Sequence, residues 1–261
     1  MTDMTDAKRL DFQRGFPGFE NLFRAELSRW FGTRRWLGQA VLWTLLIDGM
    51  IAMIGIVSKV FEEMEAGAAD ARQIFGLIAV IGSIGTVIIL QNVIINEKEN
   101  GVASWILSKP VSRGSYVLAK LLGNAAGVMV CVIMIPGLFL YPLISLMFVG
   151  SWLPLGNFLL ALAVLALEIL FYLSLTVMLG TAFEKRGAVL GLPLVLIFGQ
   201  QAIIGLIGRL IYVLPYSLST ITAGSILLGE EIQFVTPLLT TPVFILLFGL
   251  LAGYLFRREE F

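Results

Sequence analysis

The sequence predicts an all-α polytopic membrane protein with six transmembrane helices. Of its 261 residues, 58% are hydrophobic and only 14% are charged, whereas about a quarter of the residues in a typical soluble domain are charged. Uncharged stretches such as residues 74–95 reach the roughly 20 apolar residues that a helix needs to cross a hydrocarbon core. Basic residues gather between alternate stretches, which is typical of a chain that crosses a membrane several times.

The N-terminal region, residues 1–36, is predicted to be a cytoplasmic tail with an amphipathic interfacial helix. Aromatic and aliphatic side chains recur at helical spacing over residues 19–31, and arginines lie on or beside the other face. A simple continuation of the first spanning helix is the alternative. The segment from Gly32 to Arg35 favours a bend, and therefore a separate helix.

Residues 37–256 form the predicted six-helix transmembrane domain, and residues 257–261 form a second cytoplasmic tail. The expected spans are about 37–58, 74–96, 116–148, 156–183, 188–212 and 236–256. Fifteen of the 18 Lys and Arg residues fall on one side of this arrangement, and only Lys59, Arg72 and Arg209 fall on the other. The excess predicts a plasma-membrane protein with both termini in the cytoplasm.

The segment 213–234, before the sixth span, is interrupted by Pro215, Gly224 and the acidic pair Glu230-Glu231, yet it keeps apolar residues throughout. It is too interrupted to span the bilayer and too apolar for a free loop. We expect a re-entrant element that dips into the outer leaflet, with an amphipathic surface loop as the alternative.

Several kinds of chemistry are excluded by composition. The chain has no histidine, which removes HExxH metal sites and Ser-His triads, and its single cysteine, Cys131, cannot form an intrachain disulfide. No Gly-Lys dipeptide occurs, so the chain lacks a phosphate-binding P-loop. We expect no metal, no bound cofactor, no nucleic-acid partner and no catalytic residue in this chain.

Polar residues inside the predicted spans are functional candidates, because an unpaired charge there costs several kcal/mol. Asp48 and Glu168 lie near the middle of their spans and either form hydrogen bonds within the bundle or take part in transport. The amides are expected to join helices. They are Gln91, Asn92, Gln200 and Gln201. The GxxxG spacings at Gly123 and Gly249 support close packing weakly.

A short polar island separates the second and third spans. Residues 102–108 can form two helical turns that end before Pro110. Ser112 can then cap the third spanning helix. An aromatic and aliphatic ridge, with Val102, Trp105 and Ile106 on one face, distinguishes this island from a plain surface loop.

The run from Glu97 to Gly123, with Glu-Asn-Gly-Val-Ala-Ser-Trp-Ile-Leu-Ser-Lys-Pro-Val-Ser-Arg and a later Ala-Lys, resembles the signature of the ABC-2 type (type-2) ABC transporter permeases. The six-span layout with both ends inside agrees with that family. The chain departs from the pattern at Val102, where threonine is usual, and at Trp105, where leucine is common.

The resemblance implies the membrane-spanning permease subunit of an ABC transporter, with export as the expected direction. It also implies that this subunit pairs with a second permease copy or homologue in the lipid bilayer. Two cytoplasmic ABC ATPase subunits would carry ATP and Mg²⁺. Residues 102–108 would be the coupling helix, 19–31 the connecting helix and 213–234 the outer re-entrant element. The residues expected to couple to the ATPase are Glu97, Glu99, Gly101, Val102, Trp105, Ile106, Leu107, Pro110 and Arg113.

Two other classes of function remain open from the sequence. An intramembrane enzyme would use Asp48 or Glu168, but it would need a second catalytic group at the same depth, and only amides and hydroxyls are available. A structural membrane scaffold would not need the folded island between the second and third spans.

Overall fold

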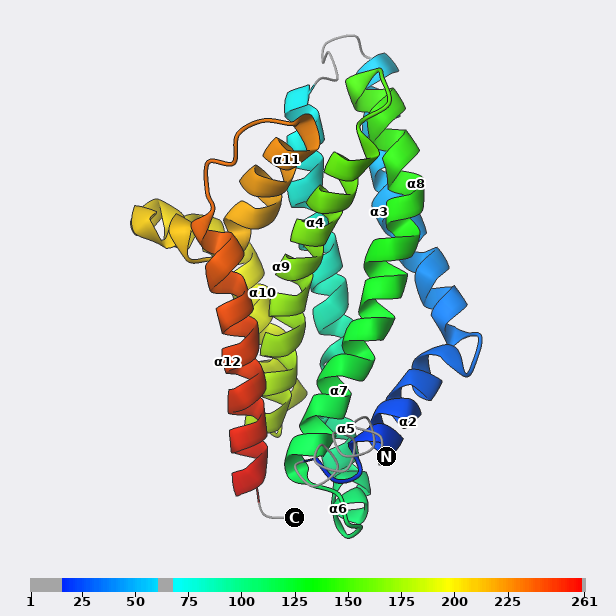
Figure 1. Ribbon diagram of the computed structural model, residues 1–261, viewed down its shortest axis with the longest axis vertical. Coiled ribbons are helices and arrows are strands. Elements are labelled where there is room, and N and C mark those ends of the chain that lie inside the picture. Colours follow the sequence, from blue (N-terminus) through cyan, green and yellow to red (C-terminus); the bar gives the residue numbers. More distant parts are fainter. Residues whose placement is uncertain (1–15, 61–67, 260–261) are drawn as a thin grey trace, which may run out of the picture.

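The computed structural model describes residues 16–60 and 68–259, and within these ranges it contains helices and turns but no strand. Long helices run side by side along one axis of the molecule (Figure 1). Five of them are long and apolar enough to cross a membrane. They cover Arg35–Val60, Ala71–Glu99, Arg113–Val149, Leu155–Ala182 and Thr236–Arg258. The chain is therefore an all-helical, multi-pass membrane protein.

The N-terminal helix α2 (Phe19–Phe31) is separate from the first spanning helix α3 (Arg35–Val60). A short turn over residues 32–34 joins them, and α2 runs obliquely across the end of the bundle (Figure 1). The predicted helix over residues 19–31 is confirmed. Its place at a membrane interface stays a prediction.

The second long segment is interrupted near one end. Helix α4 (Ala68–Leu90) stops at a turn over residues 91–94, and the short helices α5 (Ile95–Glu99) and α6 (Val102–Leu107) follow. Figure 1 shows α6 at the extreme end of the molecule, below the ends of the long helices. We call this the α6 end of the bundle.

The third long segment is one continuous helical path with two wider π turns. It consists of α7 (Arg113–Val128), η1 (Met129–Met134), α8 (Ile135–Leu143) and η2 (Ile144–Val149). Each π turn lies within two residues of a proline, Pro136 or Pro142. Proline has no N–H to donate within a helix, and a locally wider turn lets the remaining backbone groups find partners.

Helix α9 (Leu155–Ala182) is buried along much of its length, and α10 (Arg186–Leu206) follows it. The predicted fifth span, 188–212, is divided: α10 ends at Leu206, and a short 3-10 helix, η3 (Gly208–Tyr212), turns sideways (Figure 1). The apolar stretch Arg186–Gln200 of α10 is shorter than the five spans above.

The chain then turns back along α9 through the π turn η4 (Leu218–Ala223) and α11 (Gly224–Leu228), before α12 (Thr236–Arg258) returns to the α6 end. Aromatic rings join α9 to α12, where Phe171 makes edge contacts with Phe244 and Phe248. The outward faces of α3 and α12 carry exposed apolar side chains, such as Leu45 and Leu250, as expected of surfaces that contact lipid.

Candidate functional site

The short helix α6 is presented to solvent at one end of the bundle. Gly101 precedes it with a φ of +67°, in the left-handed region that favours glycine, so the chain turns sharply between α5 and α6. Trp105 points outward with 61% of its surface exposed. The Lys109 ammonium lies 3.6 Å from the centroid of the Trp105 ring and forms a cation–π contact.

The opposite side of α6 holds it to the bundle. Ala103 is fully buried, and Ile106 and Leu107 pack partly against the main hydrophobic core. The predicted ridge of Val102, Trp105 and Ile106 is therefore divided: Trp105 faces outward while Ile106 faces the core. The free surface of α6 is narrower and more polar than the sequence pattern indicated.

The turn after α6 ties the third spanning segment to the last. Pro110 is exposed in this turn, and the Ser112 hydroxyl accepts a hydrogen bond of 3.0 Å from the Ser115 N–H, which caps α7 as predicted. The Arg113 guanidinium donates to the carbonyls of Arg257 at 2.6 Å and Glu259 at 2.8 Å. Arg113 therefore satisfies backbone acceptors at the end of α12.

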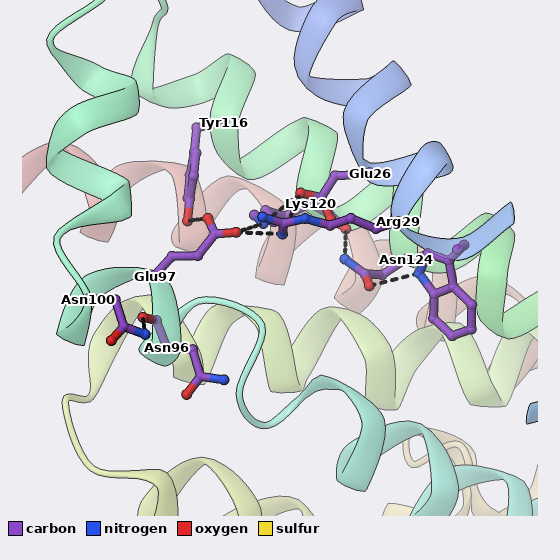
Figure 2. A network of polar contacts seen from close by, with 9 residues as sticks. Glu26, Arg29, Asn96, Glu97, Asn100, Tyr116, Lys120 and Asn124 are labelled. Carbon is purple, nitrogen blue, oxygen red and sulfur yellow. Dashed lines mark hydrogen bonds and ion pairs between the residues drawn. The ribbon is translucent and has the colours of Figure 1, made fainter. Parts of the chain in front are cut away.

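A network of charged side chains, buried at Glu26, Glu97 and Lys120 and half-exposed at Arg29, joins α2, α5 and α7 (Figure 2). The Lys120 ammonium lies 2.6 Å from a carboxylate oxygen of Glu26 and 2.6 Å from one of Glu97. The Arg29 guanidinium reaches the same two carboxylates at 3.1 Å and 2.5 Å. The Tyr116 hydroxyl donates to the second Glu97 oxygen at 2.6 Å.

This network is balanced in charge, because two carboxylates face two cations. Burial alone would lower the pKa of Arg29, but the Glu26 and Glu97 carboxylates favour its charged form, and the pKa is raised above its ordinary value. Removing one partner of a buried pair leaves an uncompensated charge and typically costs about 3–5 kcal/mol. The network therefore holds three elements in one register.

Two glycines let α2 approach α7 closely enough for these contacts. A Cβ atom on Gly127 would lie 2.0 Å from the Trp30 ring, and one on Gly123 would lie 2.4 Å from the Glu26 Cβ. The Trp30 indole N–H donates to the Asn124 side-chain oxygen at 3.1 Å. The GxxxG spacing at Gly123 thus accommodates the N-terminal helix.

Glu97, one of the residues expected to couple to the ATPase, lies inside this network. Only 6% of the Glu97 surface is exposed, because its carboxylate is enclosed by Lys120, Arg29 and Tyr116. Its coupling role stays a prediction. Glu99 does remain at the surface, where it pairs with Arg186 of α10 at 2.7 Å.

Sequence reasoning missed Glu26, Lys120 and Asn124 as members of this site. Tyr116, Lys120 and Asn124 recur at intervals of four, which places polar groups along one face of α7 at the start of an apolar span. That pattern was a usable signal. The partners of Lys120 and Asn124 in α2, Glu26 and Trp30, lie 94 residues away in sequence.

The intramembrane polar candidates lie apart from this site. A Glu168 carboxylate oxygen accepts a hydrogen bond of 3.2 Å from the Ser219 backbone N–H in η4. Asp48 is buried, and neither of its oxygens has a hydrogen-bond partner among the described residues. Gln200 accepts a hydrogen bond of 3.1 Å from the Tyr172 hydroxyl, and joins α10 to α9 as expected of an interhelical amide.

The other amides occupy the break in the second span and the neighbouring helix. The Gln91 amide donates to the Ile88 carbonyl at 3.2 Å, and the Asn92 side-chain oxygen is buried without a partner among the described residues. Gln201 follows Gln200 in α10. Among the described residues, the hydrogen bonds of Gln91 and Gln200 do not involve Asp48 or Glu168.

In the described ranges, no group of three or more His, Cys, Asp or Glu side chains could hold a metal ion. The arrangement at the α6 end offers a rigidly held surface with an exposed aromatic ring and ordered ion pairs behind it. Such a surface suits recognition of another protein, because Trp is enriched at the centres of interfaces.

Comparison with known proteins adds one match. A family model described as ABC-2 family transporter protein matches residues 60–210, which is more than half of the chain. The matched region runs from the end of α3 to η3 and includes α5, α6 and the predicted coupling residues. A search of curated proteins found no match to the chain.

Proposed function

The chain belongs to the ABC-2 transporter family, and from this premise we propose that it is the permease subunit of an ABC exporter driven by a separate cytoplasmic ATPase. Family membership and the five apolar spans support a membrane transport subunit and not an enzyme. The partner ATPase, the outward direction and a pairing with a second permease are parts of the proposal.

The observation that carries the proposal is the presentation of α6. This helix lies beyond the ends of the spans (Figure 1). Its inner side is fixed by the buried Ala103, and its outer side exposes Trp105. Directly behind α6, the network of Glu26, Arg29, Glu97 and Lys120 joins α5 to α2 and α7. A partner that displaces α6 would therefore also displace α5, and through the ion pairs of Glu97 it would displace α7, which is part of a long spanning helix.

The proposed orientation places the α6 end in the cytoplasm. The described basic residues of α2, α5, α7 and the end of α12 gather there, whereas Arg72 pairs with Glu230 at the opposite end. An excess of Lys and Arg on the cytoplasmic side is the usual determinant of orientation. An ATPase docked at α6 would then have access to cytoplasmic ATP and Mg²⁺.

A pair of tryptophan variants tests the docking proposal. Trp105→Asp places a charge on the outer surface of α6 and should abolish co-purification with the co-expressed partner ATPase, without loss of membrane insertion. The matched control is Trp152→Asp, because Trp152 is 59% exposed at the opposite end of the bundle. Full ATPase recovery with Trp105→Asp would show that α6 is not the docking surface.

Direction is tested in inside-out membrane vesicles, where an exporter accumulates its substrate inside the vesicle when ATP is added outside. ATP-dependent accumulation of a candidate lipid-soluble substrate in these vesicles, and its loss in Trp105→Asp, is the expected result. Accumulation only in right-side-out vesicles loaded with ATP would indicate import.

A further inference from the structure

An apolar groove lies between three spanning helices on the side of the bundle, starting at the α6 end. It encloses about 520 Å³, within the range of about 300–1,000 Å³ that is common for ligand sites. Leu118 and Leu122 of α7 line one side, and Leu250 and Tyr254 of α12 line the other. Leu173 of α9 is buried between them and forms the floor.

The length of the groove matches one leaflet of a bilayer. On α12 it extends from Ile245 to Arg257, and at a rise of about 1.5 Å per residue this distance is about 18 Å. Half of a hydrocarbon core about 30 Å thick is about 15 Å. A lipid acyl chain that lies in the groove would therefore reach from the bundle end to the middle of the membrane.

The mouth of the groove is cationic. The Arg257 guanidinium lies beside Gly114, whose Cβ position is 3.7 Å from Nη2, and no described carboxylate pairs with it. The Arg258 guanidinium carbon lies 4.5 Å from the centroid of the Tyr254 ring, which is itself part of the lining. The nearest acid in sequence, Glu259, is already paired with Lys98 at 2.5 Å.

We propose that this groove binds an anionic glycerophospholipid, with an acyl chain between α7 and α12 and the phosphate at Arg257 and Arg258. Apolar walls of one-leaflet length select a lipid tail, and two cations at the mouth select a negative headgroup. The bound lipid would stabilise α12 against α7, the helix that begins directly after α6. This lipid binding requires no ATPase partner, and it goes beyond the transport function proposed above.

The headgroup assignment is tested by native mass spectrometry of the purified full chain in detergent. The chain is titrated with phosphatidylglycerol and with phosphatidylcholine that carry identical acyl chains. We expect phosphatidylglycerol to bind about fivefold more tightly at the first site, since one Arg near a membrane surface contributes about 1 kcal/mol. Arg257→Gln should remove most of this preference.

Lys185→Gln is the matched charge control, because Lys185 is exposed at the same end of the bundle but does not line the groove. It should leave the preference unchanged. The headgroup assignment is wrong if the unaltered chain binds the two lipids equally, or if Arg257→Gln leaves the preference unchanged. Either result would indicate non-selective lipid binding, as at the surface of any membrane protein.

A substitution that fills the groove tests whether the acyl chain of the lipid lies there. A Cβ atom on Gly253 meets no other atom within 4 Å, so Gly253→Leu should fold well and also gain helix propensity. Its side chain would occupy the groove and displace several methylene groups of the lipid, which should weaken binding on the order of tenfold.

Gly191→Leu in α10 is the control, because its Cβ position is equally open but lies outside the groove. The melting midpoints of both variants show whether each has folded. Normal phosphatidylglycerol binding by a folded Gly253→Leu variant would refute the groove as the site.

Discussion

Replacement of Lys120 by methionine is the sharpest test of the buried network. The Lys120 ammonium is 2.6 Å from both carboxylates, and only 2% of the residue's surface is exposed. Methionine keeps most of the side-chain volume but leaves Glu26 and Glu97 to share the single Arg29 cation. The network then carries one uncompensated negative charge in a buried place.

The loss of one partner from a buried pair typically costs about 3–5 kcal/mol. At about 2–4 °C per kcal/mol for a chain of this size, the melting midpoint should fall by roughly 6–20 °C. The midpoint is measured on the purified chain in detergent by heating, followed by size-exclusion chromatography. Lys185→Met, at an exposed position, should change the midpoint by no more than about 2 °C.

A second substitution tests whether charge is the cause. Glu26→Gln added to Lys120→Met restores neutrality, with Arg29 facing Glu97 at 2.5 Å. We expect the double variant to be more stable than Lys120→Met alone, although Glu26→Gln destabilises the unaltered chain. If the two losses simply add, uncompensated charge is not what destabilises Lys120→Met, and the reasoning fails.

Three further predictions concern packing, the intramembrane acid and topology. Gly127→Leu should displace α2 from α7 and lower the melting midpoint sharply, because the Trp30 ring occupies the Cβ position of Gly127. Gly191→Leu should not, because its Cβ position is open. Equal melting midpoints for the two variants would contradict the close approach of α2 to α7. Glu168→Gln keeps an acceptor for the η4 backbone N–H and should retain most ATPase coupling, while Glu168→Leu should lose stability. Loss of coupling in a stable Glu168→Gln variant would instead point to a proton at this site. Ser104 and Glu231 are both exposed, and they lie at opposite ends of the bundle. In a cysteine-free background, Glu231→Cys should react with an impermeant thiol reagent added outside cells, whereas Ser104→Cys should not. The reverse labelling pattern would invert the proposed topology.

The local elements were predictable because their signals are local. Apolar length predicts the long helices, helical spacing predicts α2, and Gly101 with Pro110 brackets α6. The six-span count and the re-entrant role of residues 213–234 stay predictions. In the structure, the fifth expected span is divided between α10 and η3 after Leu206.

The network could not be predicted, because its members become neighbours only when α2 crosses α7. Glu97 stands in a polar loop in the sequence, next to Glu99, and nothing local distinguishes a buried carboxylate from an exposed one. Positions two apart in a helix point in nearly opposite directions, so within α5 Glu97 points toward Lys120 and Glu99 toward Arg186. Long-range pairing of charges decides this part of the site.

The break at residues 91–94 has a mechanical consequence. A force applied to α6 meets a non-helical joint before it reaches α4, whereas rigid ion pairs connect α5 to α7 through Glu97 and to the end of α12 through Lys98. A force on α6 would therefore reach α7 and the end of α12 through ion pairs, and would reach α4 only through the turn at residues 91–94. Because α7 and α12 form walls of the proposed lipid groove, we expect such a force to change the groove before it moves α4.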